Sequence, residues 1–216
     1  MFVKHNGFVQ FGCGPNAPHT AWTDFDASPT LRIQKIPLLG RVITSGMVRF
    51  SPHTHYGDIV KGLPIEAASC KAIYCSHVLE HLSLEDATQA MRHVYGYLSP
   101  GGIFRCVVPD LERYVTDYLQ STSPDAAIHF MRATLLGEAK RGRGLMGVLR
   151  YLVGNAAHRW MWDFKSLKSS LEEAGFVEIR RAAFADSMEP LFGQVEVQGR
   201  WCDALGVECV RPSMDK

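Results

Sequence analysis

The feature that most constrains the fold is a short apolar run, Phe8–Phe11, that leads directly into the glycine-rich turn GCGP at residues 12–15. An apolar run of this length that ends at glycine is typical of a buried β-strand entering a tight turn. A second apolar run, residues 21–26, ends only twelve positions after Gly14. That gap is too short for a full crossover helix, so a compact turn is expected to join the first two strands.

The same alternation of short apolar runs and helical patterns continues along the chain. Ser83 is a plausible N-cap for a helix over residues 83–97, because Asp86 follows three positions later and apolar residues repeat along one face. Gly175 is expected to end a helix over residues 163–174. The other expected elements are a third strand near residues 47–50 or just after, strands at 71–76, 103–108, 176–184 and 206–211, a helix from 109 to about 119, and helices within 125–155.

Strand–helix alternation with short connections predicts an α/β fold, with a Rossmann-like, doubly wound, mostly parallel sheet covered on both faces. No repeat or linker divides the chain, so residues 1–216 are expected to form a single domain. In such sheets ligands bind beyond the carboxyl ends of the strands, where the winding order reverses. The glycine turn is expected to lie at that point.

Composition narrows the function classes. Hydrophobic residues make up 46% of the chain and charged residues 21%, which is ordinary for a globular protein. A formal net charge of +1 predicts no broad attraction to nucleic acid or to an anionic membrane. The six cysteines form no CxxC pair and are expected to be reduced, and no signal peptide or membrane span is evident. A cytoplasmic location is therefore expected.

Two carboxylates follow strand ends near the glycine turn. Gly12 and Gly14 lack a Cβ and so let a ligand approach the main chain. Asp26 ends the second strand, where an ionised carboxylate can accept both hydroxyls of a ribose, and Asp58 follows the third strand, where it can meet the amine of adenine. The alternative without a ligand is that the glycines serve only the turn and the aspartates end solvated loops.

Two nucleosides fit this pattern. A dinucleotide usually has its acidic residue about twenty positions past the glycines and a third glycine where Ala17 stands here. S-adenosylmethionine has no phosphate and needs only a glycine turn against its amino-acid end and a carboxylate on its ribose. The short gap between Gly14 and Asp26 favours S-adenosylmethionine.

Six motifs in order resemble a known family: FVQFGCGPN, WTDFDASP, GDIVKGLP, AIYCSHVLEHL, YGYLSPGGIFRCVVPDLE and SLEEAGF. Together they resemble class I S-adenosylmethionine-dependent methyltransferases, most closely the small methyltransferase type 11 group. The resemblance implies S-adenosyl-L-methionine as cofactor, S-adenosyl-L-homocysteine as product, and a seven-stranded sheet with an antiparallel last strand. It also implies that residues 121–162 form a helical cap over the acceptor site.

The resemblance implies residue roles as well. The cofactor-binding residues are expected to be Gly12, Cys13, Gly14, Pro15, Asp26, Asp58, Ile59, Ser76 and His77. The sequence departs from the family where Gln10 replaces a frequent acidic residue and where Lys71 replaces an aspartate. A cofactor-binding module without catalysis therefore stays an alternative, as does a nicotinamide-dependent oxidoreductase.

The histidines carry the catalytic expectations. His77 and His158 are candidate general bases, needed only if the acceptor starts protonated. The alternatives for His77 are a wall of the cofactor pocket or a purely structural side chain. The alternative for His158 is an anchor between a cap helix and the domain. HVLEH at residues 77–81 also matches the H-x-x-E-H zinc motif, but no third ligand is marked and no metal site is expected. His81 is expected to be a structural histidine with local hydrogen bonds.

The segment 121–162 combines basic and aromatic residues. Arg141 and Arg143 are candidates to bind a carboxylate or phosphate on the acceptor, although a charge cluster is more often a solvated face. The expected function is methyl transfer to oxygen or nitrogen of a small molecule, such as a saccharide or an acidic metabolite. No nucleic acid or membrane partner is expected, and the sequence does not give the oligomeric state.

Overall fold

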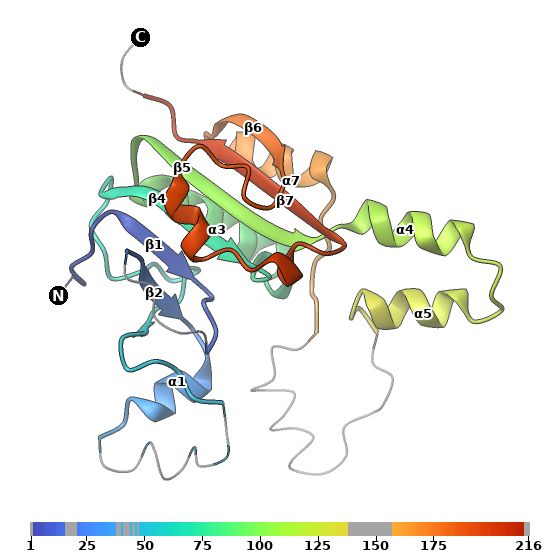
Figure 1. Ribbon diagram of the computed structural model, residues 1–216, viewed down its shortest axis with the longest axis horizontal. Coiled ribbons are helices and arrows are strands. Elements are labelled where there is room, and N and C mark those ends of the chain that lie inside the picture. The colour runs from blue at the N-terminus through green and yellow to red at the C-terminus, as the bar shows by residue number, and fades with distance from the viewer. Residues whose placement is uncertain are drawn as a thin grey trace.

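A single β-sheet organises the computed structural model, which describes residues 2–15, 21–37, 40, 44, 46, 48–137 and 157–213. In those residues the sheet has seven strands in the order β3-β2-β1-β4-β5-β7-β6 (Figure 1). The strands are β1 Phe8–Phe11, β2 Thr23–Asp26, β3 His55–Tyr56, β4 Cys70–Ser76, β5 Leu98–Pro109, β6 Val177–Ala182 and β7 Ala204–Val210.

The sheet is mostly parallel, as predicted. β1 pairs in parallel with β2 and β4, β2 with β3, and β4 with β5. The last strand, β7, lies antiparallel between β5 and β6. The strand order reverses between β1 and β4, so the carboxyl ends of these two strands flank the position where ligands bind in open α/β sheets. The expected Rossmann-like class is confirmed.

The helices begin and end largely where their capping residues predict. Ser83 accepts a hydrogen bond from the Asp86 amide at the start of α3, and Gly175 takes a positive φ of 102° after α7. The α-helices are α1 Pro29–Gln34, α3 Leu84–Tyr97, α4 Leu111–Gln120, α5 Ala126–Ala133 and α7 Phe164–Glu173. Three 3-10 helices are η1 Leu79–His81, η2 Pro190–Gln194 and η3 Gln198–Arg200.

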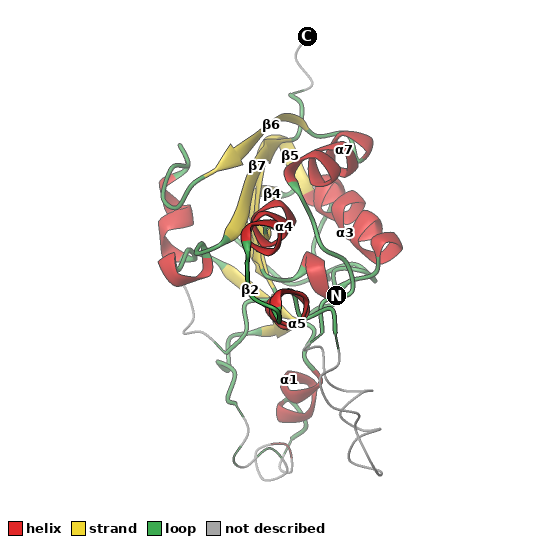
Figure 2. Cartoon of the chain, turned by 90° about the vertical axis from the view of Figure 1, so that its right-hand side faces the viewer, coloured by secondary structure: helices red, strands yellow, loops and turns green. Residues whose placement is uncertain are grey.

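The two faces of the sheet are covered differently. Helices α3 and α7 lie on one face and enclose the larger core cluster, which includes Met91, Leu167 and Phe104 (Figure 2). The opposite face is covered by the segment with η2 and η3, where Phe192 packs against Trp22 and Tyr74. The sheet is thus covered on both faces, but short 3-10 turns replace an α-helix on the second.

Three local differences separate the structure from the sequence expectations. The third strand lies at His55–Tyr56, after residues 47–50 as the expectation allowed, but it has only two residues. Helix α1 was not anticipated; Ser28 caps it and Pro29 opens it. Strand β5 starts at Leu98 directly after α3, because the SPGG segment continues the strand through an irregular register instead of separating the elements.

Further expectations concern the cysteines and the membrane. All six cysteines lie in the described residues, none is in a disulfide, and all but Cys202 are buried. Among the helices that the structure describes, none combines the length and the apolar composition that a membrane crossing requires.

Candidate functional site

A cavity of about 300 Å³ lies at the carboxyl ends of the first four strands. Each of these strands contributes the residues that directly follow it. The lining residues are Phe11, Gly12, Asp26, Ala27, Ser28, Pro29, Gly57, Asp58, Ile59, His77, Val78, His81 and Leu82. Five of the predicted site residues therefore line one cavity: Gly12, Asp26, Asp58, Ile59 and His77.

Gly12 and Gly14 both need glycine, for different reasons. Both have positive φ, 67° and 65°, a conformation that L side chains rarely adopt. A Cβ on Gly12 would lie 2.2 Å from Val78 Cγ2, so this glycine lets β1 approach the segment after β4. A Cβ on Gly14 would meet nothing within 4 Å, so the main chain there borders open space.

Asp26 connects the glycine turn to the end of β2. Its Oδ2 accepts a hydrogen bond from the Gly14 amide at 2.9 Å, and its Oδ1 accepts one from the Ser28 amide at 2.7 Å. The residue is 8% exposed and lines the cavity. A carboxylate has about four acceptor positions, so two remain for a ligand. The amides hold this carboxylate in place before any ligand arrives.

Asp58 is the second carboxylate of the cavity. Its Oδ1 accepts from the Val60 amide at 3.1 Å, and its Oδ2 lies 3.4 Å from Lys61 Nζ. Its side chain is one-quarter exposed, so it is more accessible than Asp26. The two carboxylates lie at the ends of neighbouring strands, because β2 and β3 pair in register up to Asp26 and Tyr56.

The other predicted cofactor residues lie behind or beside the cavity. Cys13 is buried and its Sγ donates to the Gly14 carbonyl; burial raises the pKa of this thiol to about 12, so it stays protonated. Pro15 is exposed. Ser76 is buried, and Arg200 donates to its hydroxyl at 2.9 Å and to its carbonyl oxygen at 2.6 Å.

His77 lies on the cavity wall with both ring nitrogens close to protein acceptors. Its φ is 51°, which turns the chain sharply at the end of β4. Nε2 lies 2.9 Å from the Arg200 carbonyl oxygen, and Nδ1 lies 3.2 Å from Glu80 Oε1. Since a carbonyl only accepts, Nε2 carries the hydrogen in this arrangement.

His158 belongs to the segment before α7 and lies close to His81, which lines the cavity. Its side chain also approaches that of Glu80. Burial lowers the pKa of His158, so its imidazole favours the neutral form. His81 has a hydrogen-bond contact with the Ala157 carbonyl, far along the chain, in place of the local partner expected for it.

Arg141 and Arg143, the candidate acceptor-binding residues, lie outside the described residues. Helix α5 lies within the expected cap, residues 121–162, and packs beside the preceding helix α4 beyond the end of β5, with Tyr118 against Phe130 (Figure 1).

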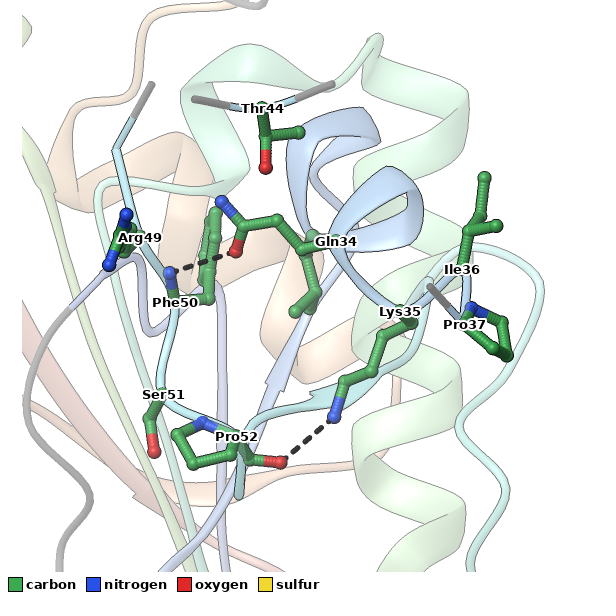
Figure 3. A pocket seen from close by; sticks show the side chains of 10 residues that line it. Gln34, Lys35, Ile36, Pro37, Thr44, Arg49, Phe50, Ser51 and Pro52 are labelled. Carbon is green, nitrogen blue, oxygen red and sulfur yellow. Dashed lines mark hydrogen bonds between the residues drawn. The ribbon is translucent and has the colours of Figure 1, made fainter. Parts of the chain in front are cut away.

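A larger cavity, of about 720 Å³, lies between α1 and residues 48–52 (Figure 3). Two of its polar side chains bind the main chain opposite: Gln34 accepts from the Phe50 amide at 3.1 Å, and Lys35 donates to the Pro52 carbonyl at 3.0 Å. It has no carboxylate among its described lining residues. The smaller cavity at the strand ends, which two carboxylates line, is therefore the candidate cofactor site.

Two residues of this region were missed by sequence reasoning. Arg200 holds Ser76 and contacts His77, but it lies 124 positions after Ser76 and no motif marks it. Glu80 is fully buried beside His77 and His81. The sequence marked Glu80 only as the glutamate of the H-x-x-E-H match and gave no sign that it would be buried.

Comparison with known proteins gives a family and a fold. Residues 13–180 match the family described as "Methyltransferase domain". A chain of the complex between the Haloferax volcanii Trm112 methyltransferase activator and a methyltransferase superposes with a TM-score of 0.52 at 15% identity, over 100% of this chain and 86% of that chain. At that identity the likeness shows the fold alone. No curated protein sequence matches the chain.

Two further solved structures have a lower similarity. The S-adenosylmethionine-dependent methyltransferase SibL in its apo form has a TM-score of 0.48 at 18% identity, over 95% of this chain and 50% of that chain. The structure of PigF with SAH has a TM-score of 0.48 at 12% identity, over 96% of this chain and 50% of that chain. The present chain thus spans about half the length of both.

Proposed function

We propose, on the premise that this chain belongs to the methyltransferase domain family, that it transfers a methyl group to an oxygen or nitrogen atom of a small molecule. It is a class I S-adenosylmethionine-dependent methyltransferase, as its motifs predicted. The proposal concerns the acceptor and the residues that serve the reaction. A saccharide or an acidic metabolite is the acceptor class we favour, with Arg141 and Arg143 as its binding residues.

The observation that carries the cofactor assignment is the hydrogen bond from the Gly14 amide to Asp26 at the cavity edge. The hydrogen bond fixes a carboxylate that keeps free acceptor positions, next to the Gly14 main chain, which borders open space. In our proposal Asp26 accepts the ribose hydroxyls, Asp58 and Ile59 border the adenine, and Gly12 and Gly14 give room to the amino-acid end. Cys13, Pro15 and Ser76 support this edge of the cavity.

S-adenosylmethionine, when bound, supplies an electrophilic methyl group on a sulfonium. The chain's own contribution is then to hold the acceptor atom in line with that methyl and to exclude water. We propose that His77 forms the wall nearest the acceptor and that residues 121–162, which include α5, form a cap over it. His77 and His158 as general bases stay predictions, and an acceptor that is already deprotonated needs neither.

The proposal allows a protein partner, as in the Haloferax volcanii complex, and assigns no surface to it. The alternative hypothesis is that the chain binds S-adenosylmethionine but has lost catalysis. Turnover measured against a panel of acceptors tests it. None of the described residues that line the cavity favours a nicotinamide cofactor over S-adenosylmethionine.

Calorimetric titration of Asp26→Ala tests the cofactor site. Losing hydrogen bonds to a charged group costs about 1.5–3 kcal/mol, so the variant is expected to bind S-adenosylmethionine and S-adenosylhomocysteine roughly tenfold to a hundredfold more weakly than the parent. Asp125→Ala is the matched control, because Asp125 is exposed and makes no side-chain cap hydrogen bond.

Asp26 also binds two backbone amides, so thermal unfolding of each variant is measured in parallel. A folded Asp26→Ala variant that binds with the parent's affinity contradicts the assignment. A parent that binds NAD but neither sulfur nucleoside contradicts the function itself.

A further inference from the structure

We propose that Glu80, His81 and His158 form a binding site for a divalent transition-metal ion of the zinc type. Their ligand atoms, one carboxylate oxygen and one ring nitrogen from each histidine, all lie within 4.8 Å of one another. Two imidazoles with one carboxylate suit zinc or iron better than magnesium or calcium, which prefer oxygen ligands. Ligands of one ion lie about 3–3.5 Å apart, so small side-chain rotations would close the cluster.

The Glu80 carboxylate is the strongest indication of a missing ligand. Its side chain is fully buried, and neither oxygen has a hydrogen-bond partner among the described residues. Oε1 lies 3.2 Å from His77 Nδ1, without the alignment of a hydrogen bond, and 3.9 Å from His81 Nε2. Burying an ionised carboxylate is costly unless it is paired or coordinates a metal.

His81 is oriented as a metal ligand requires. Its Nδ1 lies 3.2 Å from the Ala157 carbonyl oxygen. A carbonyl only accepts, so Nδ1 carries the hydrogen and Nε2 presents its lone pair toward Glu80. A hydrogen bond from the second ring nitrogen to a backbone carbonyl is the usual way in which proteins fix a ligating histidine.

His158 joins the cluster from another part of the chain. Its Nδ1 is buried and has no hydrogen-bond partner among the described residues. The rings of His81 and His158 lie edge to face with centroids 5.0 Å apart. His81 thus uses one nitrogen on the main chain, and His158 has a buried ring nitrogen that no described residue binds.

Backbone hydrogen bonds hold the two ligand segments together. The Glu80 carbonyl oxygen accepts from the amides of Arg159 at 2.7 Å and Trp160 at 3.1 Å. The His158 amide donates to the Leu135 carbonyl at 3.2 Å. The main chain on both sides of the cluster is therefore fixed independently of any ion, as a preorganised site needs.

This ligand set differs from the H-x-x-E-H motif in the sequence. That motif uses His77 and His81 as ligands and the glutamate as a base, and it offered no third ligand. In the structure His77 precedes η1 and is held by the Arg200 carbonyl, whereas His158 supplies the third ligand. The expectation of no metal site rested on the motif alone.

The site would border the cofactor cavity, because His81 lines that cavity. Three protein ligands leave at least one coordination position open. If the proposed function holds, that position could bind an oxygen or nitrogen atom of the acceptor. Metal binding itself does not depend on this consequence, and it is measured without S-adenosylmethionine.

Equilibrium dialysis with metal analysis, and cobalt absorption spectra, test the site on the full chain. The metal-free parent is titrated with Zn²⁺ and Co²⁺, with Mg²⁺ as the oxygen-preferring comparison. We expect one Zn²⁺ or Co²⁺ per chain, a Co²⁺ spectrum of nitrogen and oxygen ligation, and a raised melting temperature. His81→Ala and His158→Ala are each expected to weaken binding by more than about tenfold.

His129→Ala is the control, because His129 is an exposed histidine on α5 outside the cluster; it is expected to bind as the parent does. Melting curves without metal establish that each variant is folded. A parent that binds neither ion overturns the proposal, as does parent-like affinity in either folded cluster variant. Binding of S-adenosylmethionine by a parent that takes up no metal would overturn the metal site and leave the proposed function intact.

Discussion

Two fully buried charged side chains, Arg105 in β5 and Glu80 in η1, lie in environments of opposite character. Arg105 meets the carboxylates of Asp186, Glu196 and Glu208, donates to the Ala183 carbonyl, and lies 4.7 Å from the ring centroid of Trp201. Glu80 has three imidazoles nearby and no aligned donor among the described residues.

The contrast separates a structural charge from a functional one. The Arg105 guanidinium forms its hydrogen bonds with groups of the same chain. These bonds fasten the η2–η3 segment to the sheet face that lacks an α-helix. The Glu80 cluster lies at the carboxyl edge and stays incomplete. A buried charge that the protein does not satisfy by itself is more informative about a ligand than one that it satisfies fully.

The largest effect is expected from Arg105→Met. Removing one member of a buried ion network leaves its carboxylates without a partner, which costs about 3–5 kcal/mol of the free energy of unfolding. Chemical denaturation measures it, with Arg113→Met as control, because the Arg113 pairs are half exposed and should contribute nothing measurable. A parent-like Arg105→Met variant would mean that the network does not hold the η2–η3 segment.

A smaller effect is expected from acid. Burial alone would raise the pKa of Asp186, but hydrogen bonds from Arg180, the Ala183 amide and Arg105 lower it to about 2 from an ordinary value of 3.8. The folded pKa is the lower one, so Asp186 stabilises the fold above about pH 3.8 and this contribution is lost as the pH falls toward 2.

Unfolding at a series of pH values compares the parent with Asp186→Asn. The variant should lose stability less steeply between about pH 4 and pH 2, whereas the exposed Asp125→Asn control should follow the parent. Identical slopes in all three proteins would show that Asp186 is not held by the arginines in solution.

The smallest change in stability is expected from Glu80→Gln in the metal-free protein. The amide keeps the shape of the side chain and removes a buried charge that lacks donors, so the free energy of unfolding should change by less than about 1 kcal/mol. Glu173→Gln, at an exposed position, is the control. A loss above about 2 kcal/mol would place Glu80 with Arg105, as a charge that the fold itself requires.

Much of the fold followed from the sequence because its signals are local. Gly12, Ser83 and Gly175 mark a turn, a helix start and a helix end through their own backbone or hydrogen-bonding properties. Asp26 could be assigned to the cavity because the strand before it fixes where it lies. Such inferences need only neighbouring residues.

The parts that were missed depend on distant residues. The acidic partners of Arg105 lie 81 to 103 positions away, and the apolar run around it gave no hint of which face they would reach. The proposed metal site brings Glu80 together with His158, which is far away in the sequence, and no sequence motif predicts that contact. Helix α1 was missed because its six residues carry too short a pattern to recognise.

The hydrogen bond between Leu135 and His158 has a consequence for how this enzyme could diversify. Residues 135 and 158 lie beside each other, and the segment after residue 158 is fastened again at the Glu80 carbonyl. The cost of closing a loop rises only slowly with its length. The intervening stretch could thus be exchanged as a cassette, by evolution or by design, without changing the residues that line the cavity at the strand ends.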